Sequence, residues 1–88
     1  MTSTEMKKKL EKIMDHYGEK NQVSKLSEEL EELMLEAECA SISEVDDDFK
    51  SEVADVLVVC SQFAIKYPEI LEIMEQKVDR QIKRMEAE

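Results

Sequence analysis

Two pairs of carboxylates, each with its members three residues apart, are the residues whose types and spacing suggest chemistry. Glu29 and Glu32 form the first pair, and Glu52 and Asp55 form the second. Residues three apart lie on the same face of a helix, so each pair presents two carboxylates side by side. Carboxylate-only clusters suit hard cations, and Mg²⁺ is the common choice where phosphates are also ligands. The two pairs therefore predict a Mg²⁺ site, provided that their helices face each other.

The second pair includes a carboxylate inside an apolar run. From Val53 to Cys60 every residue except Asp55 is apolar. A helix that is apolar on all sides is expected to be buried on all sides, so Asp55 is expected to be at least partly buried. A lone buried carboxylate is costly unless it is paired or binds a metal. The alternatives are a solvated acidic face, or neutralisation by a basic residue such as Lys25, one turn before Glu29.

Four helical segments are expected to position these carboxylates. Apolar residues recur with helical spacing in residues 4–17, 21–40, 45–66 and from 68 to the C-terminus. Gly18 is expected to end the first helix as a left-handed cap, and Ser43 with Asp46 resembles a capping box before the third. Pro68 suits the first turn of the fourth helix. The pattern predicts an all-α fold, a four-helix bundle-like domain over residues 1–88 with a central antiparallel hairpin.

The hairpin brings the two carboxylate pairs to one level. When two helices fold antiparallel, residues whose numbers have the same sum lie opposite each other. Glu29 with Asp55 and Glu32 with Glu52 give the same sum, with the mirror point at Ile42, inside the expected turn. Four like charges so close together cannot all stay ionised without a counter-ion. This matching favours a metal over a solvated face.

Composition limits the classes of function. The chain has 88 residues with one Gly, one Pro and a formal net charge of −10. So few turn formers exclude a β-sandwich or barrel, and the negative charge argues against nucleic-acid and membrane binding. There is no apolar stretch of the roughly 18 residues that span a membrane, and no signal-peptide pattern, so a cytoplasmic location is expected. Cys39 and Cys60 are expected to be reduced core residues.

A thin core and surplus apolar residues predict self-association. A chain of this size buries only roughly 60–65% of the surface that the unfolded chain exposes. Met34 and Leu35 lie off the apolar stripe of the second helix, and Val58 and Val59 lie off that of the third. Excess apolar surface of this kind indicates partner subunits, so we expect oligomerisation, as a homodimer or homotetramer, to complete the bundle.

The carboxylate pairs also resemble the signature of a known family. Glu29-Leu30-Glu31-Glu32 and, after nineteen further residues, Glu52-Val53-Ala54-Asp55 are similar to the ExxE…ExxD signature of the MazG-like, all-α nucleoside triphosphate pyrophosphohydrolases. The flanking residues are similar too: Lys25-Leu26-Ser27-Glu28 before the first pair, Val56-Leu57 after the second, and His16-Tyr17-Gly18 with Gln22 in the lead-in. The resemblance extends from about Tyr17 to Arg84.

The resemblance implies a reaction and roles for the four carboxylates. The reaction would be Mg²⁺-dependent hydrolysis of an NTP or dNTP to the monophosphate and pyrophosphate. Glu29, Glu32, Glu52 and Asp55 would be the metal ligands and catalytic residues. Glu32 is our choice for the group that accepts the proton of the attacking water.

Five further polar residues are candidates for substrate binding: Gln22, Lys25, Lys77, Gln81 and Arg84. Members of the family often carry a Lys and, four residues on, an Asn in the last helix, where this chain has Lys77 and Gln81. Arg84 continues their stripe, for which a solvated face is the alternative. Gln22 and Lys25 share the stripe of the first carboxylate pair, and a polar contact at the helix start is the alternative for them.

Two other functions stay open at this point. One is a non-catalytic acidic helical interaction module, and the other is an acidic mimic of nucleic acid. Both account for surface acids. Neither gives a reason for Asp55 inside an apolar run or for the level matching of the two pairs.

Overall fold

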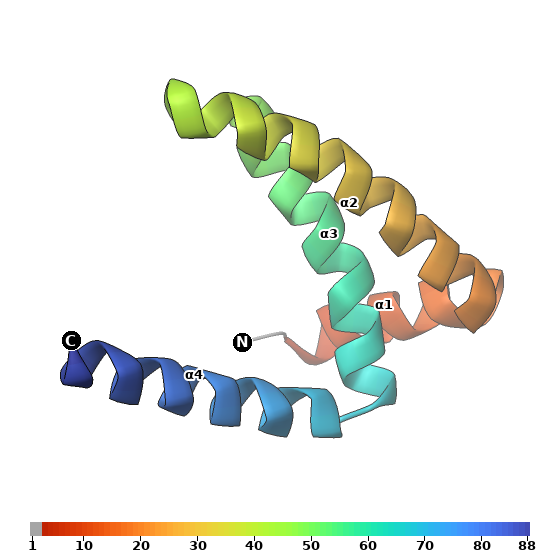
Figure 1. Cartoon of the computed structure of the whole chain (residues 1–88). Coiled ribbons are helices and arrows are strands. Elements are labelled where there is room, and N and C mark those ends of the chain that lie inside the picture. Colours follow the sequence, from red (N-terminus) through yellow and green to blue (C-terminus); the bar gives the residue numbers. More distant parts are fainter. Residues whose placement is uncertain (1–2) are drawn as a thin grey trace.

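Four helices make up the fold, which is known from a computed structural model that describes residues 3–88. They are α1 (Thr4–Tyr17), α2 (Glu19–Ile42), α3 (Asp47–Lys66) and α4 (Glu69–Ala87) (Figure 1). Residues 3–88 contain no strand, so the predicted all-α class is confirmed. The first helix has the predicted bounds, while α2 is two residues longer at each end than predicted and α3 begins two residues later.

Gly18 alone separates α1 from α2. Its φ of 86° is in the region that favours glycine, but its ψ of 154° is extended, so it is not the left-handed helical cap that we expected. Its N–H donates to the carbonyl of Met14, which closes α1, and α2 begins at the next residue. The single glycine therefore redirects the chain without a loop.

The connection between α2 and α3 is capped differently from the prediction. Asp46 is the N-cap of α3, and its Oδ1 accepts a hydrogen bond from the N–H of Phe49 at 2.9 Å. The predicted capping role of Ser43 is wrong, because α2 continues to Ile42 and leaves Ser43 at the end of that helix. There its hydroxyl donates to the carbonyl of Cys39 at 3.1 Å.

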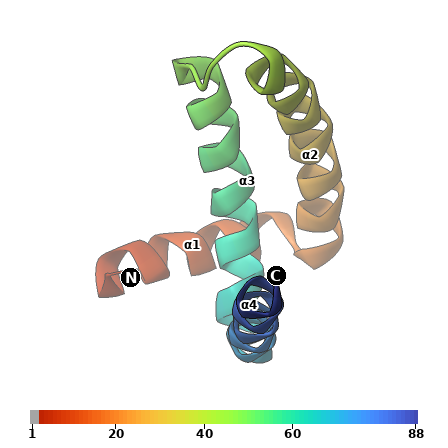
Figure 2. The same cartoon turned by 60° about the vertical axis from the view of Figure 1, so that its left-hand side comes forward.

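The central element is the predicted antiparallel hairpin of α2 and α3. Helix α1 crosses near its open end and packs against both helices (Figures 1 and 2). Helix α4 turns away after Pro68 and, within residues 3–88, packs against α3 alone. Tyr67 and Lys66, at the end of α3, contact the carboxylate of Glu19 at the start of α2 through a hydrogen bond and an ion pair. These contacts hold the open end of the hairpin together.

The interior is small and half of it is polar. Six residues within residues 3–88 are buried: Leu10, Met14, Val59, Gln22, Glu29 and Gln62. The apolar stripe predicted for α2 is wrong in part, because Val23 and Leu30 are exposed whereas Glu29 is buried. The reason is that, among the described helices, only α1 and α3 pack against α2, so one of its faces is buried, and this is the face that carries Glu29.

The apolar run of α3 is not buried on all sides. Leu57 is 56% exposed, Val58 is also exposed, and Asp55 is exposed rather than partly buried. Val59, which was expected to lie off the stripe, belongs to the core. Since α1, α2 and the first part of α4 do not surround α3, one of its sides stays open.

Other expectations about the surface have mixed outcomes. Met34 and Leu35 are exposed, as predicted, but Cys39 and Cys60 are exposed free thiols rather than core residues. None of the helices in residues 3–88 is long and apolar enough to cross a membrane.

Candidate metal centre

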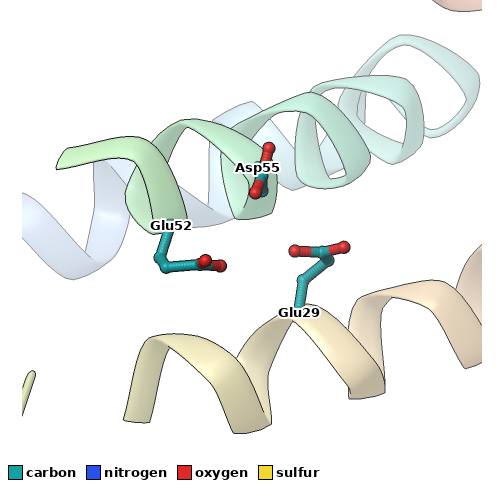
Figure 3. A group of neighbouring side chains, drawn as sticks. All are labelled: Glu29, Glu52 and Asp55. Carbon is teal, nitrogen blue, oxygen red and sulfur yellow. The ribbon is translucent and has the colours of Figure 1, made fainter. Parts of the chain in front are cut away.

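Three carboxylates from the two helices of the hairpin meet in one place. Glu29 projects from α2 toward Glu52 and Asp55 of α3 (Figure 3). One carboxylate oxygen from each of the three lies within 4.8 Å of the others. A six-coordinate Mg²⁺ with ligands at about 2.0–2.1 Å draws its oxygen ligands to within roughly 4.2 Å of each other. Small side-chain movements would therefore be enough for the three to share one cation.

Two oxygens of this cluster are buried without a hydrogen-bond partner. They are Oε2 of Glu29 and Oε2 of Glu52, and Glu29 as a whole is only 6% exposed. A buried acceptor without a partner costs roughly 1–3 kcal/mol, more if it is charged, so such atoms are rare in native proteins. A cation bound between the two helices would satisfy both. The donor set, made of carboxylate oxygens alone, fits a hard divalent cation.

The electrostatics of the cluster show how closely the charges are packed. The pKa of Glu52 is raised above its ordinary value, first by burial, then by the charge of Glu32 and a hydrogen bond with it, and also by the charges of Asp55 and Glu29. Burial and the neighbouring like charges thus both disfavour the ionised form of Glu52.

Glu32 stands apart from the other three carboxylates. It is exposed, and its oxygens are outside the group that lies within 4.8 Å. It contacts the cluster through Glu52. The structure therefore brings together three of the four predicted ligands, with the fourth beside them.

Lys25 is paired with the buried carboxylate of the cluster. Its Nζ lies 3.1 Å from Oε1 of Glu29 and 3.9 Å from Oε2 of Glu28. The hydrogen bond with Glu29 and the charge of Glu29 raise the pKa of Lys25. The sequence suggested that Lys25 either neutralises the carboxylates or contacts the substrate. Its position beside Glu29 fits both interpretations.

A cleft of about 480 Å³ opens beside the carboxylates. Glu29, Asp55 and Lys25 line one part of it, and the amides of Gln22 and Gln62 line another. Ligand sites typically measure 300–1,000 Å³, so the volume suits a small organic ligand.

Gln62 is a site residue that the sequence reasoning missed. It is 2% exposed, its Nε2 donates to the carbonyl of Val58 at 3.3 Å, and its Oε1 has no partner. The available signal was its spacing, because Gln62 follows Asp55 by seven residues and so lies on the same face of α3.

Lys77, Gln81 and Arg84 are not near the carboxylates of their own chain. All three are exposed on α4, none lines the cleft, and α4 packs only against α3 within residues 3–88. The turn at Tyr67 and Pro68 directs α4 away from the hairpin (Figure 2). The predicted cationic wall is therefore absent from the part of the single chain that the structure describes.

A second acidic group lies near the turn of the hairpin and comprises Glu36, Asp46 and Asp48. Asp46 already caps α3, and Asp48 lies in its first turn, where a negative charge is favourable. No buried oxygen without a partner occurs in this group, among the side chains that the structure describes. The positions of Asp46 and Asp48 are therefore explained by the N-terminus of α3.

No protein-family model, curated protein or solved structure matches this chain. The similarity to MazG-like enzymes stays a prediction made from the carboxylate spacing.

Proposed function

We propose that this protein is a divalent-cation-dependent nucleotide pyrophosphohydrolase. It would cleave an NTP or dNTP between the α- and β-phosphates, giving the monophosphate and pyrophosphate. The observation that carries the proposal is the cluster of Glu29, Glu52 and Asp55, in which two buried carboxylate oxygens have no partner. The spacing of the two pairs in the sequence supports the same reaction.

In this proposal the carboxylates have separate tasks. Glu29, Glu52 and Asp55 hold Mg²⁺ between α2 and α3. When bound, Mg²⁺ would neutralise phosphate charge and polarise the α-phosphoryl group toward attack by water. Glu32, which is exposed beside Glu52, is free to accept the proton of that water.

The cleft would hold the nucleotide. Among the described residues that line it, Lys25 is the basic one and would contact the phosphates, while the buried Gln22 and Gln62 offer amide groups. The side chains of Tyr17, Val58 and Val59 give it an apolar wall. Such a mixture of a few polar groups on apolar walls is typical of small-molecule sites.

We further propose that the chain acts as a homodimer or homotetramer. Its accessible surface is 7243 Å², whereas a compact monomer of this mass exposes about 5,300 Å². The radius of gyration is 15.3 Å, against about 12 Å for a compact domain of this length. The excess of roughly 1,900 Å² per chain, or about 3,800 Å² for two chains, lies within the range of about 2,000–5,000 Å² that obligate homodimers bury in total. Association also offers a route by which Lys77, Gln81 and Arg84 of one copy approach the carboxylates of another.

The test is pyrophosphate release from a panel of NTPs and dNTPs in the presence of Mg²⁺. We expect turnover by the natural sequence, no turnover by Glu52→Gln, and normal turnover by the control Glu31→Gln. Glu31 is an exposed acid on the same helix as Glu29 and lies outside the cluster. Equal losses in the two variants would contradict the assigned site.

The exposed apolar faces favour a second candidate, a helical interaction module without catalytic activity. All of the large apolar residues of α4 are exposed, among them Leu71, Val78 and Ile82. Absence of pyrophosphate release across the whole panel, from protein that is folded and binds no Mg²⁺, would favour this alternative.

A further inference from the structure

The two carboxylate oxygens of Glu29 have different surroundings. Oε1 lies 3.1 Å from the ammonium of Lys25, and Oε2 is buried without a partner. The Glu29 side chain is 8% exposed, whereas that of Lys25 is 51% exposed. One partner of this ion pair is thus fixed in the interior, and the other is half in solvent on a flexible stem.

Lys25 is the basic side chain of the cleft. Among the described residues that line the cleft, the other charged ones are Glu28, Glu29 and Asp55, all acidic. Glu52 adds a further carboxylate, with an oxygen within 4.8 Å of oxygens of Glu29 and Asp55. In the absence of a metal, Lys25 therefore acts as the local counter-ion for the cluster.

A dication held by Glu29, Glu52 and Asp55 would lie within a few ångströms of the Lys25 ammonium. The two cations repel each other, and both depend on the same carboxylate. Glu29 cannot move away, because it is enclosed between α2 and α3. The half-exposed Lys25 can rotate into the cleft, and the bound cation then replaces it as the counter-ion of Glu29, so the buried carboxylate is not left unpaired.

We propose that Lys25 is an exchangeable counter-ion. It neutralises Glu29 when the metal is absent, and it transfers to the phosphates of the ligand when the metal is bound. This inference rests on the proposed function for the identity of the ligand. The exchange itself is inferred from the Lys25–Glu29 ion pair and from the position of Lys25 in the cleft.

The exchange predicts opposite effects of one substitution on two ligands. Removing the charge in Lys25→Gln should tighten Mg²⁺ binding about tenfold, because the competing cation is gone. The same variant should weaken binding of inorganic tripolyphosphate in the presence of Mg²⁺ by a comparable factor. A residue that only stabilises the helix would change neither affinity.

The experiment is isothermal titration calorimetry at one fixed pH, first with Mg²⁺ alone and then with tripolyphosphate at saturating Mg²⁺. The matched control is Lys9→Gln, which removes another Lys–Glu pair of the same i, i+4 spacing, on α1 and outside the cleft. Lys25→Arg keeps the charge and should retain the order of affinities of the natural sequence. All three variants, Lys25→Gln, Lys25→Arg and Lys9→Gln, are checked for helical content by circular dichroism.

Three outcomes separate this inference from the proposed function. Unchanged or weaker Mg²⁺ binding by Lys25→Gln overturns the competition, and unchanged tripolyphosphate binding overturns the transfer. Both readouts are independent of turnover, so they hold even if no nucleotide is cleaved. Failure of the natural sequence to bind Mg²⁺ at all would overturn the proposed function and the exchange together, whereas failure of the exchange alone leaves pyrophosphate release intact.

Discussion

The hairpin of α2 and α3 and the projecting helix α4 use their amphipathic patterns in opposite ways. The hairpin buries polar side chains, among them Glu29 and Gln62, and leaves Leu30 and Leu57 exposed. Helix α4 has a regular apolar stripe, yet none of its residues is buried. Buried polar groups without partners indicate a ligand, while an exposed apolar stripe indicates another polypeptide. The two regions therefore point to two different kinds of partner.

The largest expected effect is a loss of activity when a carboxylate of the hairpin is changed. Asp55→Asn should lower kcat/KM for the nucleotide by about 100-fold or more, because even groups that only support metal ligands are worth 10–100-fold. The same variant should lose the rise in melting temperature that Mg²⁺ gives to the natural sequence. Pyrophosphate release and thermal melts with and without Mg²⁺ measure the two effects. A variant that kept both would show that the cluster is not a metal site.

The next effect concerns α4. Val78→Asp places a charge in the exposed apolar stripe and should weaken self-association by about 2 kcal/mol or more, the size of an interface hot spot. Gln76→Asp adds the same charge to the same helix outside that stripe and serves as the control. Sedimentation equilibrium measures both association constants. Equal effects of the two substitutions would mean that the stripe is not the contact between copies.

A smaller effect tests the open end of the hairpin, at the residue that precedes the turn into α4. Tyr67→Phe removes the hydrogen bond from the Tyr67 hydroxyl to Glu19, which connects the end of α3 to the start of α2. The loss should lower the free energy of unfolding by about 1 kcal/mol, measured by urea denaturation. Tyr17→Phe, on α1, is the control. No difference between the two variants would show that this contact does not hold the open end of the hairpin.

The smallest effect is a dependence of stability on pH in the metal-free protein. The folded pKa of Glu52 is raised, so the native state keeps a proton that the unfolded state releases at lower pH. The free energy of unfolding should therefore fall as the pH rises from the ordinary glutamate pKa of about 4.5 through the raised value. Urea denaturation in the presence of a chelator should show a shallower fall for Glu52→Gln. An equal fall in both proteins would show that Glu52 is not the group that causes the pH dependence.

Much of the fold could be predicted because it depends on local interactions. The bounds of α1, the break near Ile42 and the start of α4 after Pro68 follow from helical spacing and from residues that end or begin helices. The capping residue of α3 was misplaced because Ser43 and Asp46 both suit an N-cap. The choice between them depended on how far α2 continued.

The candidate site could be predicted in part for a similar reason. The spacing of Glu29, Glu52 and Asp55 determines on which face of its helix each residue lies. An antiparallel hairpin brings those faces together. Gln62 was missed because a single amide carries no pattern until its burial is known. Lys77 and Arg84 are exposed on α4, which packs only against α3 in the part of the chain that the structure describes. The spacing of residues within a helix does not say in which direction the preceding turn sends that helix.

The sequence by itself determined that the chain is helical, where its helices break and that two acidic pairs can face each other, because these properties depend on neighbours within a few residues. Only the tertiary structure decided that Glu29 is buried and paired with Lys25, that Asp55 is exposed and that α4 stands away from the hairpin. Burial and orientation depend on which faces other helices cover. The number and the angles of those helices are set by packing across the whole chain.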